Sequence, residues 1–158
     1  MPKVSTCLWF DRDAEAAVNL YVSLVPDSHI DHVQRSPGPW PGGETGDAIL
    51  VVFTLGGQSF QALNGGRASN YETAASISVS CEDQAEVDHL WSALTADGGA
   101  EIMCGWLRDP WGVPWQIVPK ALPRLLASSD PAAAGRVFTA MTQMIKLDVA
   151  ALEQAAAG

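Results

Sequence analysis

Two stretches of this chain repeat one pattern at an offset of seventy positions. Residues 6–24 run from an apolar segment through Asp13 into an apolar helical stripe, and residues 76–94 do the same through Asp83. Each stretch predicts a short strand, a helix-capping aspartate and an amphipathic helix. A chain that builds one unit twice is expected to fold as a pair of modules, with a functional cavity lined by both copies.

Further strands are expected to follow the helix in each module, three in the first and two or three in the second. In the first module they fall at residues 28–35, 48–55 and 58–63, and the Pro- and Gly-rich segment 36–47 forms a loop. Trp40, at the middle of this loop, is either a lid over a pocket or a packing anchor. The second module places its strands at 75–81, within 100–107 and at 114–118. We therefore predict one α+β domain over residues 1–158, with β-α-β-β-β modules at about 3–66 and 74–119.

The pattern changes after Pro119, where residues 120–158 predict a helical extension. Helices are expected at 121–127, at 131–146 after Asp130, and at 149–156 after Asp148. The middle helix has an apolar stripe, which suggests that the extension packs on the sheet or on a partner subunit. The stripe consists of Val137, Phe138, Met141, Met144 and Ile145.

Composition excludes several classes of function. Nine basic and eighteen acidic residues give a net charge of −9, which disfavours binding to nucleic acid or to an anionic membrane. Three cysteines without metal-type spacing predict free thiols and a cytoplasmic protein. The N-terminal segment has no signal-peptide apolar run, and no stretch approaches the length of a membrane span.

Several short strings occur in a fixed order: Leu8-Trp9-Phe10-Asp11, Pro26-Asp27-Ser28, Phe53-Thr54-Leu55-Gly56-Gly57-Gln58, Leu63-Asn64-Gly65-Gly66, Cys81-Glu82-Asp83-Gln84 and Cys104-Gly105-Trp106-Leu107. Together with the doubled module, they resemble the PhnB-like branch of the vicinal oxygen chelate superfamily. That superfamily contains glyoxalase, bleomycin-resistance proteins and extradiol dioxygenases, and the branch carries the label 3-demethylubiquinone-9 3-methyltransferase. The resemblance extends over nearly the whole chain, including the C-terminal helices. It implies an eight-stranded sheet curled into an open-barrel cup, and commonly a homodimer.

Alternation of side chains along strands predicts which residues line the cup. If Cys7 and Trp9 face the first helix, the neighbouring residues of that strand face the cup. In the second module Ile77 and Val79 face their helix and leave three serines on the cup wall. The predicted ligand-binding set is Thr6, Leu8, Phe10, Gln61, Leu63, Ser76, Ser78, Ser80, Trp106 and Gln116.

No metal site and no cofactor are expected. The resemblance implies that metal-using members place His, Gln or Glu at the positions of Thr6, Gln61, Ser76 and Gln116. This neutral set lacks the imidazole or carboxylate that divalent catalytic sites use. His29 and His32, three apart on one strand, are expected on opposite faces. S-adenosylmethionine is not expected either, because no glycine-rich loop follows the first strand.

Three interpretations of function remain open. The first is a homodimeric protein that binds a small organic molecule in a metal-free cup. The second is an enzyme, either the methyltransferase of the family label or a metal-dependent glyoxalase or dioxygenase, with no catalytic residue assigned. The third is a dimeric structural module with a vestigial pocket.

Overall fold

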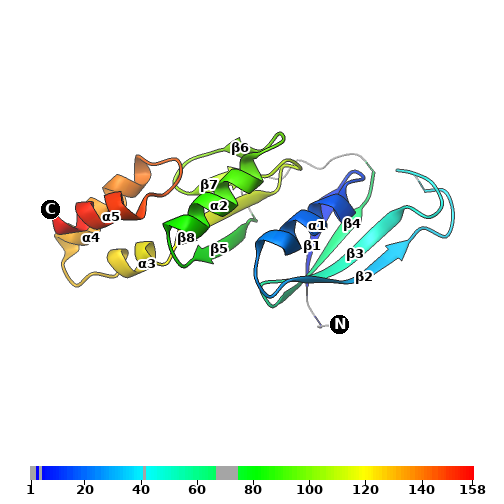
Figure 1. The fold of residues 1–158 in the computed structure, drawn as a ribbon, viewed down its shortest axis with the longest axis horizontal. Coiled ribbons are helices and arrows are strands. Elements are labelled where there is room, and N and C mark those ends of the chain that lie inside the picture. Colours follow the sequence, from blue (N-terminus) through cyan, green and yellow to red (C-terminus); the bar gives the residue numbers. More distant parts are fainter. Residues whose placement is uncertain (1–2, 4, 41, 67–74) are drawn as a thin grey trace. The chain divides into compact units, whose positions relative to one another are not determined.

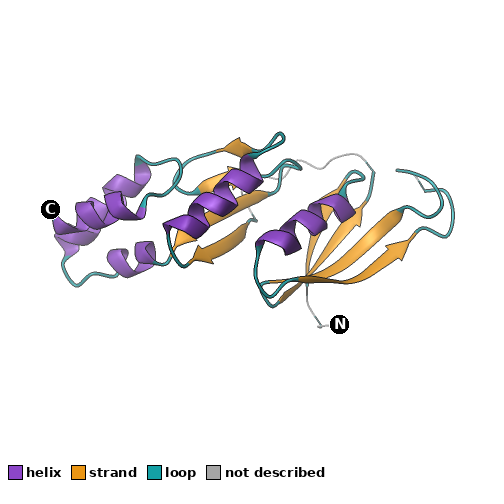
Figure 2. Ribbon diagram, viewed as in Figure 1, coloured by secondary structure: helices purple, strands orange, loops and turns teal. Residues whose placement is uncertain are grey.

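The computed structural model describes residues 3, 5–40, 42–66 and 75–158. The chain divides into two compact units, Met1–Asn70 and Tyr71–Gly158, and each is described by itself. Among the described residues, eight strands form two four-stranded sheets. The predicted α+β class with two β-α-β-β-β modules and C-terminal helices is confirmed (Figures 1 and 2).

Unit 1 is a mixed sheet with one helix on one of its faces (Figure 1). The strand order is β1-β4-β3-β2, with β1 parallel to β4 and the other neighbours antiparallel. Tyr21 of the helix lies against Phe53, with ring centroids 6.4 Å apart, and Phe53 stacks on Phe60 at 5.4 Å. The elements are β1 (Thr6–Phe10), α1 (Ala14–Leu24), β2 (His29–Arg35), β3 (Ala48–Leu55) and β4 (Gln58–Asn64).

A buried amide fixes the start of α1. Asn64, at the end of β4, accepts a hydrogen bond from the Ala14 backbone N–H at 2.9 Å and donates to the Ala48 carbonyl at 2.8 Å. Asp13 occupies the N-cap position, as its place in the sequence predicts, but its side chain makes no capping hydrogen bond. A side chain from a distant strand therefore satisfies the N–H group of the first helical residue, whereas the local aspartate accepts from none of the N–H groups that follow it.

Unit 2 repeats the same topology, with strand order β5-β8-β7-β6. The predicted apolar stripe of its helix, Val87, Leu90, Trp91 and Leu94, is buried against the sheet. Asp83 caps this helix as predicted, since its Oδ1 accepts from the Glu86 backbone N–H at 2.9 Å. The elements are β5 (Ile77–Cys81), α2 (Gln84–Thr95), β6 (Ala100–Glu101), β7 (Trp106–Arg108) and β8 (Pro114–Pro119).

Three helices follow β8, namely α3 (Ala121–Leu126), α4 (Pro131–Thr142) and α5 (Val149–Ala157). The prediction that one helix runs from 131 to 146 is wrong, because α4 ends at Thr142. The Met144 and Ile145 carbonyls instead accept backbone hydrogen bonds from Cys104 and Gly105, at 2.9 and 2.8 Å. Ile145 is therefore exposed rather than part of a buried stripe. No helix in the described ranges is long and apolar enough to cross a bilayer.

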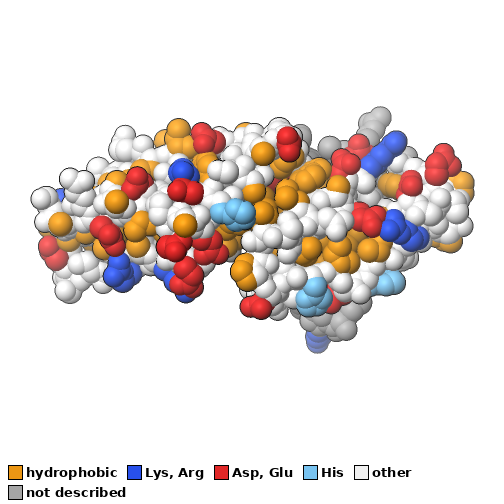
Figure 3. Space-filling view, viewed as in Figure 1, with side chains coloured by type: hydrophobic (Ala, Val, Ile, Leu, Met, Phe, Trp, Pro, Cys, Tyr) orange, Lys and Arg blue, Asp and Glu red, His pale blue; other side chains and the backbone are white. Residues whose placement is uncertain are grey.

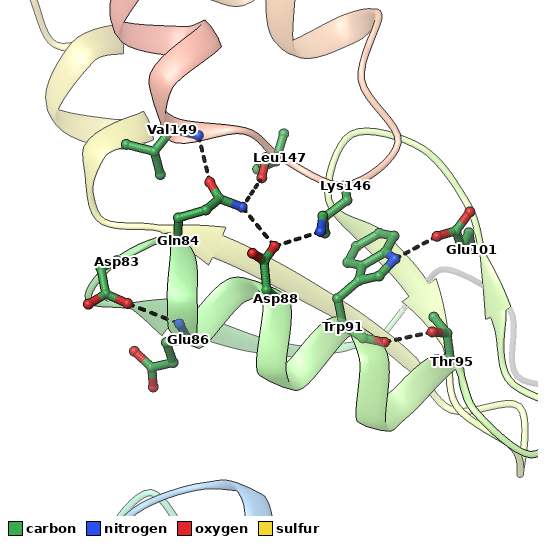
Figure 4. A network of polar contacts seen from close by, with 10 residues as sticks. All are labelled: Asp83, Gln84, Glu86, Asp88, Trp91, Thr95, Glu101, Lys146, Leu147 and Val149. Atoms are coloured by element: carbon green, nitrogen blue, oxygen red, sulfur yellow. Dashed lines mark hydrogen bonds and ion pairs between the residues drawn. The ribbon is translucent and has the colours of Figure 1, made fainter.

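A polar network joins the C-terminal segment to the outer side of α2 (Figure 4). Lys146 donates to Asp88 at 2.6 Å, and the Gln84 amide donates to Asp88 and to the Leu147 carbonyl. The Val149 N–H donates to the Gln84 Oε1 at 2.8 Å. The three helices α3, α4 and α5 also enclose an apolar cluster, which consists of Leu122, Val137, Leu147 and Leu152.

Candidate functional site

Each sheet has a face covered by its helix, here the helix face, and an opposite face, here the open face. In unit 1 the pairs Thr6–Phe60 and Phe60–Phe53 place Thr6 on the helix face, because directly paired residues point to the same side. Leu8 and Phe10 alternate onto the same face and are only 7% and 3% exposed. The prediction that these three β1 residues face away from the helix, toward the cup, is therefore wrong.

The β1 residues that lie on the open face are Cys7 and Trp9. Cys7 pairs with Gln61, and Trp9 pairs with Leu63. Gln61 and Leu63 thus lie on the open face, as predicted. Their β1 neighbours on that face are Cys7 and Trp9 instead of the expected Thr6, Leu8 and Phe10.

One additional residue in the turn between β1 and α1 explains why the β1 side chains lie on the faces opposite to those predicted. Three residues, Asp11 to Asp13, separate β1 from α1, whereas only Glu82 and Asp83 separate β5 from α2. The helices repeat at an offset of seventy (Ala14 to Gln84), but the strands repeat at seventy-one (Thr6 to Ile77). Because side chains alternate with a period of two, a shift of one position moves every β1 side chain to the other face.

A β-bulge in β2 changes a second prediction. His29 pairs with Thr54 and His32 pairs with Val52, with a register shift at Asp31 between them. The bulge places both histidines on the open face, so the expectation that they point to opposite faces is wrong. His29 Nε2 lies 3.1 Å from Asp31 Oδ1, and Thr54 Oγ1 donates to the same carboxylate at 3.0 Å. This polar group lies on the edge strand and is exposed.

The most apolar part of the unit 1 open face surrounds Trp9. Its ring lies over Gly65, where a Cβ atom would overlap the indole, so only glycine allows this packing. Leu63 and Leu50 continue the same row across the sheet. Trp9 remains 39% exposed, and this surface can accept a flat apolar group.

The open face of unit 2 matches the sequence prediction. Ser78 pairs with Gln116 and Gln116 pairs with Trp106, so these three side chains form one row across the sheet. Ser76 joins them, because its Oγ accepts a hydrogen bond from Gln116 Nε2 at 2.9 Å. Ser80 pairs with Val118 on the same face. The residues between them, Ile77, Leu107, Trp115 and Ile117, are buried beneath the helix.

Sequence reasoning missed Arg108 on this open face. It follows Trp106 by two positions on β7, and it pairs with Pro114, two residues before Gln116. Its guanidinium donates to the Gly112 carbonyl at 3.3 Å. Side chains alternate between the two faces along β7, so the prediction that placed Trp106 on the open face could also have placed Arg108 there.

The central donor pairs of the two open faces do not fit a divalent metal centre. They are Cys7 with Gln61 and Ser78 with Gln116, and they contain no carboxylate or imidazole. The two histidines that the bulge places on the unit 1 open face lie on its edge strand, β2. Burial raises the pKa of the Cys7 thiol, which disfavours the thiolate that a metal requires. Among the described residues, no three His, Cys, Asp or Glu side chains group as metal ligands would.

The other candidate groups have structural roles. Asp109 is 1% exposed, and its carboxylate accepts from the backbone N–H groups of Trp111 and Val113 and from the Trp115 indole, each at 3.0 Å. Burial, followed by the charges of Glu86 and Asp83, raises the pKa of Cys81 to about 12, so this thiol is inert. Trp40 packs on Gly42 and Gly43 within its own loop, as a packing anchor would.

Comparisons with known proteins agree with this architecture. A family model described as 3-demethylubiquinone-9 3-methyltransferase matches residues 2–118. A putative 3-demethylubiquinone-9 3-methyltransferase, PhnB protein, from Bacillus cereus is 33% identical with a TM-score of 0.67, over 75% of this chain and 99% of that one. Protein PA1353 from Pseudomonas aeruginosa shares the fold at 18% identity and a TM-score of 0.60, over 75% and 98% of the two chains.

A glyoxalase/bleomycin resistance protein from Albidiferax ferrireducens T118 also matches, at 15% identity and a TM-score of 0.48, over 75% of this chain and 99% of that one. No curated protein matches the chain. The family model ends at residue 118, so the expected resemblance does not extend to the C-terminal helices. The chain therefore belongs to the PhnB-like, 3-demethylubiquinone-9 3-methyltransferase family.

Proposed function

We propose that this protein binds a small, flat organic molecule on the open faces of its sheets, without a metal ion. The observation that carries the proposal is the row Ser78–Gln116–Trp106 in unit 2. It combines neutral hydrogen-bonding groups with an indole. The helix α2 covers the opposite face of this sheet, and no described element of unit 2 covers the open face in the same way. Both glutamine and serine can donate and accept, so they suit a ligand with carbonyl or hydroxyl groups.

The packing on the two sides of this sheet supports a binding role. Trp115, Ile117 and Leu107 are fully buried on the helix face, so they hold the strands in place. Ser78 and Ser80 are exposed on the open face, and Trp106 and Gln116 are half-buried. The Gln116–Ser76 hydrogen bond fixes the orientation of the amide before a ligand arrives, and this lowers the entropy cost of binding.

Unit 1 offers a second surface of similar character, with Trp9 and Leu63 beside Gln61. Among the residues that the structure describes, neither open face presents a pair of carboxylates or a nucleophile with a base, which general acid–base or covalent catalysis would need. Binding is therefore better supported than turnover. Three free cysteines suit a reducing compartment, and we place the protein in the cytoplasm.

The methyl transfer named by the family description is the competing candidate. The turn after β1 is Asp11-Arg12-Asp13 and contains no glycine-rich loop for a nucleotide-like donor. Calorimetric titration with S-adenosylmethionine separates the two, because heat of binding at millimolar donor supports methyl transfer and its absence supports simple binding.

A panel of flat organic molecules, followed by protein-observed NMR, tests the proposal directly. We expect shifts at Gln116 and Trp106, and about a fivefold to tenfold loss of affinity in Gln116→Ala, the effect of one hydrogen bond. Gln154→Ala, at an exposed position on α5, serves as the matched control. Stoichiometric metal in protein purified without chelators, or equal affinity in Gln116→Ala and wild type, would contradict the proposal.

A further inference from the structure

The connection between β6 and β7 is held on two sides by other parts of unit 2. The Gly105 carbonyl accepts a hydrogen bond from the Ile117 N–H of β8 at 2.8 Å. The Cys104 and Gly105 N–H groups donate to the carbonyls of residues 144–145, at 2.9 and 2.8 Å. The segment between α4 and α5 therefore binds the two residues that come directly before Trp106, which supplies the indole of the proposed site.

These two residues have a backbone conformation that depends on support. The φ angle is 56° at Cys104 and 83° at Gly105. This left-handed region is costly for a cysteine, whereas the other described non-glycine residues found there, Asp27 and Asp97, are of a type that tolerates it. A costly conformation persists where the surrounding structure fixes it. The hydrogen bond from the Cys104 N–H to the C-terminal segment is a contact of this kind.

Gly105 allows the C-terminal segment to approach closely. A Cβ atom at this position would lie 2.9 Å from Leu147 Cδ1 and 3.0 Å from the Ile117 carbonyl oxygen, closer than ordinary van der Waals contact. Leu147 is fully buried and belongs to the apolar cluster of the C-terminal helices. A larger residue at position 105 would therefore separate the β6–β7 connection from the segment that supports it.

Side chains attach the same segment to α2 (Figure 4). Lys146 donates to Asp88 at 2.6 Å. Gln84 donates to the Leu147 carbonyl at 3.1 Å and accepts from the Val149 N–H at 2.8 Å. The surface here is polar, since acidic and basic side chains gather over α2 and the helices that follow β8 (Figure 3). Because α2 covers the helix face, the segment links that face of the sheet to the connection that leads into β7.

We infer that residues 144–147, here called the strap, position Trp106 on the open face, and that docking of the strap on α2 and ligand binding on the open face favour each other. The inference rests on the proposed function, since it describes how that same site is regulated. The strap fixes the two residues before Trp106, and pairing with Gln116 fixes Trp106 across the sheet. Coupling between two sites is reciprocal, so a strap that orders the site is itself ordered by the ligand.

The first test weakens the strap without changing any residue of the open face. Gln84→Ala/Lys146→Met, the strap variant, removes the two side chains that join the strap to α2. Arg124→Met/Gln154→Ala is the matched control, because it makes the same change in charge and removes one exposed ion pair elsewhere in the C-terminal helices. Both variants are made in the full chain and compared with wild type.

The probe is 2-naphthamide, a flat neutral molecule that carries an amide group. NMR titration should show about a fivefold loss of affinity in the strap variant, the lower end of typical coupling between two sites. The Cys104 and Gly105 amides should exchange faster with solvent in this variant. The Trp106 indole N–H resonance, assigned from Trp106→Phe, should move. The control should match wild type in all three measurements.

The second test uses wild type alone and measures the coupling in the opposite direction. Saturating 2-naphthamide should slow hydrogen exchange of the Val149 amide by about the same fivefold factor, because this amide is bonded to Gln84 while the strap is docked. The Glu86 amide, which is bonded to Asp83 at the start of α2, should not respond.

The outcomes separate the inference from the proposed function. Full affinity or an unmoved Trp106 resonance in the strap variant overturns the inference and leaves the proposed function standing. Unchanged exchange of the Cys104 and Gly105 amides has the same consequence. No binding of 2-naphthamide to wild type at millimolar concentration overturns both. If the strap variant fails to fold, the exchange measured in wild type decides, and a Val149 amide that does not respond to 2-naphthamide refutes the coupling.

Discussion

The start of α1 provides the sharpest test of how unit 1 is held together. Asn64 is 5% exposed and joins two backbone groups of other elements, the Ala14 N–H and the Ala48 carbonyl. Asn64→Ala leaves both groups buried without this partner, and each loss costs about 1–3 kcal/mol. We therefore expect the free energy of unfolding to fall by about 2–6 kcal/mol, a large part of the stability of a small domain.

The two N-cap aspartates give a matched comparison. Asp83→Ala should cost about 1 kcal/mol, because it removes the hydrogen bond from the Glu86 N–H at 2.9 Å. Asp13→Ala should cost less than about 0.5 kcal/mol, because the Asp13 side chain makes no capping hydrogen bond and acts only through the helix dipole. The predicted order of destabilisation is Asn64, then Asp83, then Asp13.

Urea unfolding followed by circular dichroism and tryptophan fluorescence measures these differences. Agreement between the two probes would show that one transition is being observed, which the extraction of a free energy requires. Asn19→Ala, which removes only an exposed side-chain bond to the Glu15 carbonyl, should stay close to wild type. The reasoning fails if Asn64→Ala costs less than Asp83→Ala, or if Asp13→Ala costs as much as Asp83→Ala.

Three further predictions concern the rest of the chain. Hydrogen bonds from Lys146 and then Gln84 lower the pKa of Asp88 below its ordinary 3.8, so the contact is kept above that pH and lost as pH falls through the lowered value. The Val149 amide resonance should therefore titrate below about pH 4 in wild type and not in Asp88→Asn. Cys81, with its pKa raised to about 12, should react with Ellman's reagent at pH 8 only after unfolding, and rapid reaction of the native thiol would contradict this. Sedimentation at micromolar concentration should give a dimer, whereas a monomer would remove the predicted homodimer.

Local sequence signals predicted the elements but not every face. The helices at Ala14 and Gln84 begin where the capping aspartates indicate, and the buried stripe of α2 is the predicted one. The β1 side chains were assigned to the wrong faces because the offset of seventy that relates the two helices was applied to the strands as well. One additional residue in the turn between strand and helix leaves the helix pattern unchanged, but it moves each side chain of the strand to the opposite face.

Two other features depended on tertiary structure. The bulge at Asp31 brings His29 and His32 to one face, and its position has no marker in the β2 sequence. The role of Asn64 depends on residues 50 and 16 positions away, so a pattern read along the chain assigns capping to Asp13. The faces of the β2 histidines and the capping of α1 were both predicted wrongly, because the contacts of these side chains depend on strands that are distant in the sequence.

The C-terminal helices connect the part of the chain outside the family match to the proposed site. The family model ends at residue 118, and Val118 itself packs against the apolar cluster of α3–α5 while pairing with Ser80 on the open face. The Gln84–Asp88–Lys146 network holds the segment between α4 and α5 on α2 (Figure 4). The extension therefore borders the β5–β8 end of the open face. If a ligand binds on that face as proposed, we expect the extension to limit how far the ligand reaches past Ser80. Because the extension lies outside the residues that the family model matches, we expect this limit to give the chain its own ligand size preference.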